Sequence, residues 1–157
     1  MKKFVALLLA VLMVASLCAC GQKDTGSDLQ TVTKGKLTMS TNAQFPPYES
    51  VADDGKGYEG TGFEGIDIEI AYALAQKLGL ELVVDDMDFD SALSAVQTGK
   101  SDIVAAGVTV TPERQNTMSF TDSYANGVQV VIVKEGSDIK SIDDLEGKKI
   151  GTQRGTT

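Results

Sequence analysis

The sequence predicts an α/β fold built on an open, mostly parallel sheet. Short runs that favour strands alternate along the chain with segments of helical period. The clearest strand, residues 103–110, is apolar along nearly its whole length, which is typical of a parallel strand covered on both faces. Gly79 and Gly99 mark the ends of the two main helical segments.

Two amphipathic segments carry the helical prediction. In residues 65–79, Ile70, Leu74 and Leu78 recur at helical spacing and are joined by two alanines, so this row is expected to form the apolar face. Residues 89–97 place Leu93 and Val96 on one face. A short helix from Thr111 and a helical turn at residues 142–145 are also expected. Strands are predicted at residues 36–40, 80–84, 103–110, 128–134 and 149–152, with a loop or hairpin at 49–65.

The stretch GVTVTPER, residues 107–114, directs attention to Arg114. Thr111 is a good N-cap, Pro112 suits the first helical position, and Glu113 suits the positive start of a helix. Arg114 would lie in the same first turn, where the helix dipole disfavours a cation. An anion is therefore expected to compensate Arg114.

In open parallel sheets, ligands bind in the crevice beyond the carboxyl ends of the strands. This rule selects residues 42–48, 107–114 and 153–157. A guanidinium offers a rigid fork that grips a carboxylate through two hydrogen bonds. Gly107 and Thr109 can present a carbonyl, an amide and a hydroxyl, and Phe45 and Phe89 can supply an apolar surface. The alternatives are a structural ion pair for Arg114 and core positions for the two phenylalanines.

Composition excludes several classes of function. The 157 residues include 14 Lys+Arg and 22 Asp+Glu, a net charge of −8, which argues against nucleic acid as a partner. Histidine is absent, so the commonest general base and the commonest metal ligand are lacking. Glycines at residues 55–65 match dinucleotide spacing but do not follow a strand, and residues 86–97 lack the glycine and the last glutamate of a calcium loop. No cofactor and no metal are expected.

The first residues resemble a bacterial lipoprotein signal. Lys2 and Lys3 precede an apolar run too short for a good membrane span, and small residues then lead to Cys20. The resemblance implies a signal peptide at residues 1–19, lipid attachment to Cys20, and a polar tether over residues 20–34. Cys18 is a worse candidate because Leu17 precedes it. The alternative is an ordinary secretory signal with two incidental cysteines.

Several segments together resemble the family 3 solute-binding proteins, the polar amino-acid receptors of bacterial ABC importers. They include TNAQFPPYE, GIDIEIAYALAQKLG, FDSALSAVQTGKSDIVAAGVTVTPER and IDDLEGKKIGTQRGTT, and the resemblance covers residues 35–157. It implies a type II periplasmic-binding-protein-like fold in which two lobes close on a ligand. Residues 35–126 would form a nearly complete first lobe, and residues 127–157 a hinge strand and the start of a truncated second lobe.

The resemblance also implies roles for individual residues. Arg114 would hold the α-carboxylate, and Asn42 would sense the ligand side chain, where a neutral amide favours a ligand such as glutamine over arginine or lysine. Phe45 and Phe89 would flank the ligand side chain. The Gly107 carbonyl and Thr109 would contact the ammonium or the carboxylate. Thr157 would add a second-lobe contact to the carboxylate, with Gln153 nearby.

The expected function is binding of a polar amino acid outside the cytoplasm for delivery to an ABC permease. The protein is expected to be a monomeric, non-enzymatic lipoprotein on the outer face of the cytoplasmic membrane. The alternatives are a cyclohexadienyl dehydratase and an amino-acid sensor or adhesin on the same fold. The chain is expected to be a fragment that ends early in the second lobe, to bind amino acids weakly or not at all, and to expose apolar surface.

Overall fold

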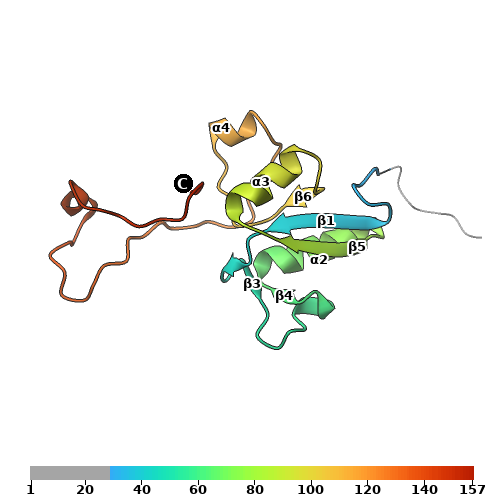
Figure 1. The fold of residues 1–157 in the computed structure, drawn as a ribbon, viewed down its shortest axis with the longest axis horizontal. Coiled ribbons are helices and arrows are strands. Elements are labelled where there is room, and N and C mark those ends of the chain that lie inside the picture. The colour runs from blue at the N-terminus through green and yellow to red at the C-terminus, as the bar shows by residue number, and fades with distance from the viewer. Residues whose placement is uncertain (1–28) are drawn as a thin grey trace, which may run out of the picture.

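The structure is a computed structural model and describes residues 29–157. The predicted signal peptide, the lipid-attachment residue Cys20 and the first part of the tether lie outside the described residues. The described part contains two small sheets, three α-helices and two 3₁₀ turns (Figure 1).

The main sheet has the predicted parallel character. Its order is β5-β1-β6, with β1 (Lys36–Thr41) between β5 (Glu81–Asp86) and β6 (Ile103–Val104), and both pairings are parallel. Because the chain enters β1 first and reaches β6 only after β5, each connection crosses the sheet through a helix. The α/β fold class is therefore confirmed.

Helices α2 (Ile66–Leu78) and α3 (Phe89–Gln97) cover opposite faces of the sheet (Figure 1). Alternation along β1 explains this arrangement, because successive side chains point to opposite faces. Met39 packs with residues of α2, whereas the hydroxyl of Ser40 donates to the carbonyl of Ala92 in α3 at 3.0 Å. The two faces of β1 are therefore covered by different helices.

The buried face of α2 agrees with the predicted one at Ala71 and Ala75 and differs from it at the larger apolar residues. Ile68, Ala71 and Ala75 are almost fully buried, whereas Ile70 and Leu74 are 44% and 38% exposed. The spacing 68, 71, 75 is equally helical, and the small alanines let the helix approach the sheet closely. The boundaries of α2 were predicted well, since Gly79 ends it in the left-handed conformation at φ 69°.

The acidic residues before α3 serve local structure. The Asp88 side chain caps the helix by accepting from the Ser91 amide at 3.1 Å, and it also accepts from the Ser91 hydroxyl. The hydroxyl first and then the amide lower the Asp88 pKa. Asp86 accepts from the Ala43 amide at 2.8 Å. Both carboxylates are thus used as hydrogen-bond acceptors at the carboxyl ends of β1 and β5.

A second, antiparallel sheet forms at the same end, as the hairpin prediction for residues 49–65 allows. It joins β2 (Gln44–Phe45), β3 (Glu49–Val51) and β4 (Phe63–Glu64) in that order, with the 3₁₀ turn η2 (Tyr58–Gly60) between β3 and β4. The Pro46–Pro47 peptide bond is cis.

The strand predicted at residues 103–110 is much shorter than expected. Only β6, Ile103–Val104, pairs in the sheet, and residues 103–105 are half-buried. In the described chain β6 is an edge strand that meets β1 alone. Beyond it, Gly107 turns the backbone at φ 53°, and its amide leaves the strand direction to donate to Asp67 at 2.8 Å. The prediction of burial on both faces was therefore wrong.

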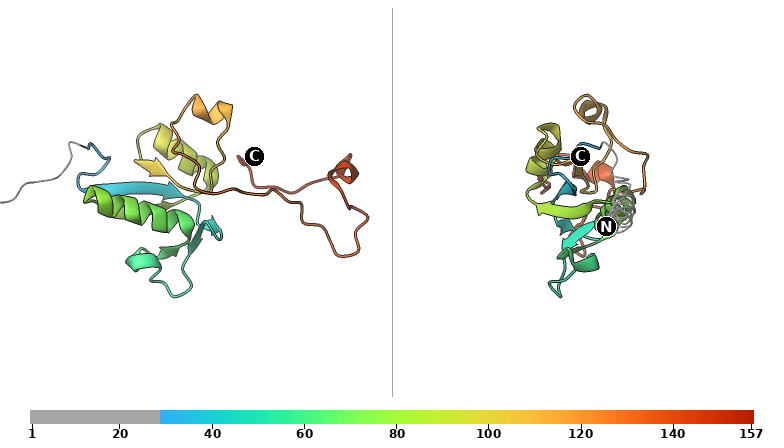
Figure 2. Two further views of the ribbon diagram at one scale, coloured as in Figure 1. Left: turned by 180° about the vertical axis from the view of Figure 1, so that it is seen from behind. Right: turned by 90° about the vertical axis from the view of Figure 1, so that its right-hand side faces the viewer.

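The strands predicted at residues 128–134 and 149–152 do not form. No strand within residues 29–157 pairs with either segment, and Val128 and Ile132 are 85% and 93% exposed. The short helices were predicted correctly as α4 (Pro112–Gln115) and η3 (Ile142–Leu145). Figure 2 shows this part of the chain running away from the sheet before the last residues return to it.

Candidate functional site

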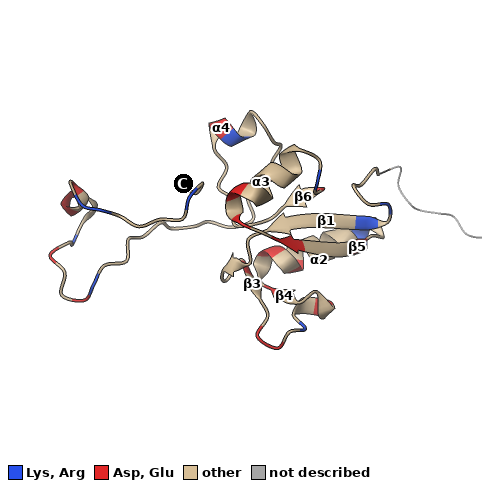
Figure 3. Cartoon of the chain, viewed as in Figure 1, with Lys and Arg blue, Asp and Glu red and all other residues tan. Residues whose placement is uncertain are grey.

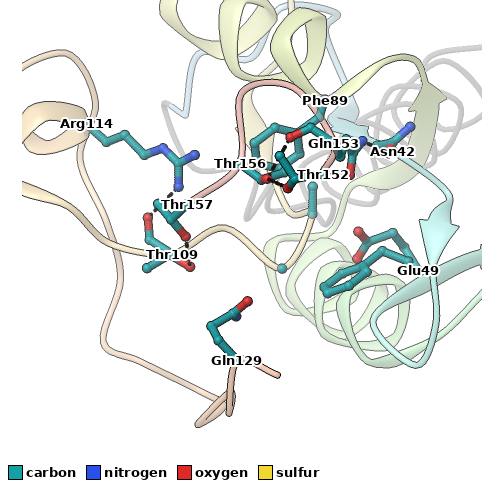
Figure 4. Close-up of a pocket in the computed structure, with 13 residues that line it drawn as sticks. Asn42, Glu49, Phe89, Thr109, Arg114, Gln129, Thr152, Gln153, Thr156 and Thr157 are labelled. Atoms are coloured by element: carbon teal, nitrogen blue, oxygen red, sulfur yellow. Dashed lines mark hydrogen bonds between the residues drawn. The ribbon is translucent and has the colours of Figure 1, made fainter. Parts of the chain in front are cut away.

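A cavity of about 310 Å³ lies beyond the carboxyl ends of β1, β5 and β6 (Figure 4). Its walls come from the loops after these strands, from β2 and β3, and from the last residues of the chain. All eight residues singled out from the sequence line this one cavity. The full lining is Asn42, Phe45, Glu49, Phe89, Ala106, Gly107, Thr109, Arg114, Gln129, Thr152, Gln153, Thr156 and Thr157.

Arg114 is held in place by backbone carbonyls. Its Nη1 donates to the Thr109 carbonyl at 2.8 Å, its Nη2 donates to the Gly155 carbonyl at 2.9 Å, and Cζ lies 5.5 Å from the centre of the Phe89 ring. Neither of the two ion pairs in the described chain involves Arg114, so the structural ion pair considered as an alternative is not seen there. The guanidinium lines the cavity and has no carboxylate partner among the described residues.

The cap of α4 orients Arg114. The Thr111 hydroxyl accepts from the Arg114 amide at 3.2 Å, and Pro112 begins the helix, as the sequence predicted. Thr109, at the edge of the cavity, brings its hydroxyl within 3.3 Å of the Thr157 hydroxyl.

The Gly107 amide already has a partner within the fold. It donates to the Asp67 carboxylate, so the carbonyl is the polar backbone group of this residue that remains. A side chain at residue 107 would meet the Phe45 ring at 3.0 Å in addition to its strained positive φ. Phe45 is 48% exposed and stacks on Tyr48, whereas Phe89 is 8% exposed and contributes to the core as well as to the cavity wall.

The last residues of the chain close one side of the cavity. Gln153 donates to the side-chain oxygen of Asn42 at 2.9 Å, and Asn42 in turn donates to the Met87 carbonyl at 2.8 Å. Arg154 pairs with Asp90 at 3.2 Å on the outside. Segments that are more than 100 positions apart in the sequence therefore meet at the cavity, as Figure 4 shows for Asn42 and Gln153.

A polar cluster of two buried carboxyl groups and the half-exposed Tyr124 was missed at the sequence level. Glu49 and Asp67 are 1% and 0% exposed, and the Tyr124 hydroxyl donates to Asp67 at 2.7 Å. Burial, then the negative charge of Asp67, then hydrogen bonding to Asp67 raise the pKa of Glu49 to about 9. Burial and the hydrogen bond to Asp67 raise the pKa of Tyr124. The three residues come from distant positions, so no short motif announces them.

The charge distribution agrees with a small ligand. Figure 3 shows acidic residues in the first turns of α2 and α3 and a basic residue on α4, which is Arg114. Among residues 29–157, no group of three or more Cys, Asp and Glu side chains is placed to hold a metal ion. The same residues contain no helix that is both long and apolar enough to cross a membrane.

The fold and the cavity define a small-molecule-binding α/β protein. A hollow at the strand ends, with apolar rings and a few convergent polar groups, is typical of such sites. The family profile of the bacterial extracellular solute-binding proteins, family 3, matches residues 37–153. The chain belongs to this family.

Known relatives support this membership. The arginine-binding extracellular protein ArtP of Bacillus subtilis (strain 168) is 39% identical over 156 residues, which cover 99% of this chain and 57% of that protein. A solved ancestral arginine-binding protein bound to arginine has a TM-score of 0.70 and 43% identity, covering 78% of this chain and 52% of the other.

A third relative is the solved ancestral amino acid-binding protein AncCDT-1, a precursor of cyclohexadienyl dehydratase. It has a TM-score of 0.51 and 36% identity, covering 58% of this chain and 38% of the other. The chain thus spans about half the length of the relatives it matches, or less.

Proposed function

We propose that this chain binds a polar amino acid outside the cytoplasmic membrane and takes part in its delivery to an ABC importer. The observation that carries the proposal is Arg114, a fixed guanidinium that faces the cavity and has only backbone carbonyls as hydrogen-bond partners. Arg114 is half-buried, and a cation of this kind is best compensated by an anion, for which a carboxylate matches the guanidinium fork.

The other cavity residues supply the remaining contacts in this proposal. The Gly107 carbonyl and the Thr109 hydroxyl contact the ammonium or carboxylate of the ligand, and Phe45 and Phe89 flank its side chain. Thr157 adds a contact to the carboxylate, with Gln153 and Asn42 beside it. The names of the relatives, which refer to arginine-binding and amino-acid-binding proteins, favour an amino acid over other small carboxylates.

The setting outside the cell follows from the family, and its details belong to the proposal. Lipid attachment at Cys20 would hold a monomer on the outer face of the cytoplasmic membrane, with residues 20–34 as the tether and an ABC permease as the partner. The relatives reported above are binding proteins, and one is an ancestral precursor of a dehydratase. Turnover of prephenate or arogenate by the purified chain would overturn the assignment as a binding protein.

Calorimetry of the full chain against a panel of polar amino acids tests the proposal. Arg114→Ala is expected to lower the affinity about 30-fold to about 4,000-fold, because truncating one partner of a buried charge pair costs about 2–5 kcal/mol. Arg154→Ala is the matched control, since Arg154 is exposed and its ion pair is worth little; it should change the affinity less than about fivefold. Unchanged affinity in Arg114→Ala would contradict the assignment of Arg114.

A further inference from the structure

The backbone of Gly107 connects the cavity wall to a buried carboxyl group. Gly107 lines the cavity, and in the proposed function its carbonyl contacts the ligand. Because a carbonyl oxygen only accepts hydrogen bonds, the ligand group that suits it is the α-ammonium and not the α-carboxylate. The Gly107 amide donates to Oδ2 of Asp67 at 2.8 Å. Glycine has no side chain to restrict its backbone, so this hydrogen bond helps to fix the direction of the carbonyl.

The fold fixes the backbone of Asp67 next to the cavity. Asp67 lies in the first turn of α2 and is fully buried. Its amide donates to the Tyr48 carbonyl at 3.0 Å, which ties the start of the helix to the loop between β2 and β3. Gly65, just before the helix, permits this approach, because a side-chain carbon there would collide with the Tyr48 carbonyl oxygen. The position of Asp67 is therefore set by contacts that do not involve its carboxyl group.

Tyr124 fixes the orientation of the Asp67 carboxyl group. Its hydroxyl donates to Oδ1 at 2.7 Å while Oδ2 accepts from the Gly107 amide, so each oxygen has its own donor. Burial raises the pKa of the neighbouring Glu49 to about 9, so Glu49 keeps its proton at neutral pH and adds no second charge beside Asp67. Without the Tyr124 hydroxyl, Oδ1 would be a buried acceptor that lacks this donor, and the carboxyl group would be free to turn away from Gly107.

We propose that Asp67 and Tyr124 are positioning residues, whose hydrogen bonds hold the Gly107 carbonyl where it accepts from the α-ammonium of the ligand. This inference rests on the proposed function, in which the ligand is an amino acid held at its α-carboxylate by Arg114. Neither Asp67 nor Tyr124 is among the residues that line the cavity. Their effect on binding therefore passes through Gly107 and is confined to ligands that carry an α-ammonium.

The probes are the polar amino acid that binds the full chain most tightly and the same compound without its α-amino group. For glutamine this deamino analogue is glutaramic acid, and for arginine it is guanidinovaleric acid. Calorimetry gives the ratio of the two dissociation constants, which measures how strongly the chain prefers the ligand that carries the ammonium. Because Gly107 accepts from this ammonium in the proposal, the unmodified chain should prefer the amino acid.

Two variants test the positioning role. Tyr124→Phe removes only the hydroxyl and should reduce the preference for the amino acid by about twofold to about 30-fold, with the affinity for the deamino analogue unchanged. Tyr58→Phe is the matched control, since it removes the same group from an exposed ring on η2, and it should leave the preference intact. Asp67→Asn can make both contacts without the charge and should keep most of the preference. A loss in Asp67→Asn as large as that in Tyr124→Phe would overturn the proposal, because the charge of Asp67 would then act on the ammonium directly.

The outcomes separate this proposal from the proposed function. If an amino acid binds but Tyr124→Phe weakens it and its deamino analogue equally, or weakens neither, the positioning role is wrong and the proposed function stands. The same conclusion follows if the unmodified chain does not prefer the amino acid. If no amino acid binds, the proposed function itself fails.

Hydrogen exchange of the Gly107 amide, measured by NMR in the unmodified chain, decides if Tyr124→Phe does not fold. Because coupling between two contacts is reciprocal, a bound ammonium at the Gly107 carbonyl should stabilise the hydrogen bond from the Gly107 amide to Asp67. The amino acid should therefore slow this exchange more than its deamino analogue does at equal saturation. Equal exchange with the two ligands overturns the proposal.

Discussion

Asp67 is expected to stabilise the folded chain next to the cavity through its hydrogen bonds. It is fully buried in the first turn of α2 and accepts hydrogen bonds from the Gly107 amide at 2.8 Å and the Tyr124 hydroxyl at 2.7 Å. Hydrogen bonds to a charged group contribute about 1.5–3 kcal/mol each. Asp67→Ala removes both and leaves a buried amide unpaired, so it should lower the free energy of unfolding by about 3–6 kcal/mol.

Asp67→Asn provides the comparison that identifies the cause. The asparagine oxygen can accept from the Gly107 amide, and its nitrogen can donate to the Tyr124 oxygen, so both contacts survive without the charge. We expect a loss of about 1 kcal/mol in this variant. Glu69→Ala is the control for charge in the first turn of the same helix, because Glu69 is exposed and removing it tests only the helix dipole.

Urea denaturation of the full chain, followed by circular dichroism, measures these differences. The reasoning predicts the order Asp67→Ala, Asp67→Asn, Glu69→Ala from most to least destabilised. Equal losses in the two Asp67 variants would show that the charge matters and the hydrogen bonds do not. A loss below about 0.5 kcal/mol in Asp67→Ala would refute the role of Asp67 altogether.

Two further predictions concern the scaffold of the site. Met39→Ala should lower the free energy of unfolding by about 2–5 kcal/mol in the same assay, because Met39 is fully buried in the core between β1 and α2; a loss below about 1 kcal/mol would place the core elsewhere. Thr111→Ala should cost about 1 kcal/mol and weaken ligand binding, because Thr111 caps the helix that positions Arg114. Thr111→Ser should restore both, and equal binding by all three forms would exclude the positioning role.

The sequence predicted best the elements that depend on local patterns. Helices α2 and α3 and the cap at Thr111 are specified by apolar spacing, glycine stops and an N-cap residue, all within a few positions. Strand β1 was predicted because its residues alternate and favour extended backbone. These signals do not depend on which partner each element meets.

The predictions that failed concern features that depend on contacts between elements distant in the sequence. Residues 128–134 are rich in valine, yet a strand requires a neighbouring strand, and none in the described chain pairs with them. The apolar face of α2 was predicted correctly at Ala71 and Ala75, but two helical rows of larger residues compete, and only contact with the sheet selects Ile68 over Ile70. Periodicity alone could not decide either case.

The candidate site likewise contains one residue that local sequence identifies and others that only the folded structure identifies. Arg114 could be identified because a cation in a first helical turn conflicts with the helix dipole. The sequence of residues 107–114 is enough to recognise this conflict. Glu49, Asp67 and Tyr124 form a cluster only after the sheet, α2 and the later loop come together. A buried glutamate cannot be recognised from the sequence, because most glutamates in proteins are exposed.

The central claim is that Arg114 holds the α-carboxylate of an amino acid. The most direct measurement is a calorimetric cycle that combines Arg114→Ala with arginine and agmatine, which is arginine without its carboxylate. If Arg114 contacts the carboxylate, the unmodified chain should prefer arginine by about 2–5 kcal/mol, and Arg114→Ala should lose most of this preference. The claim is contradicted if the unmodified chain binds agmatine as tightly as arginine, or if Arg114→Ala retains the full preference.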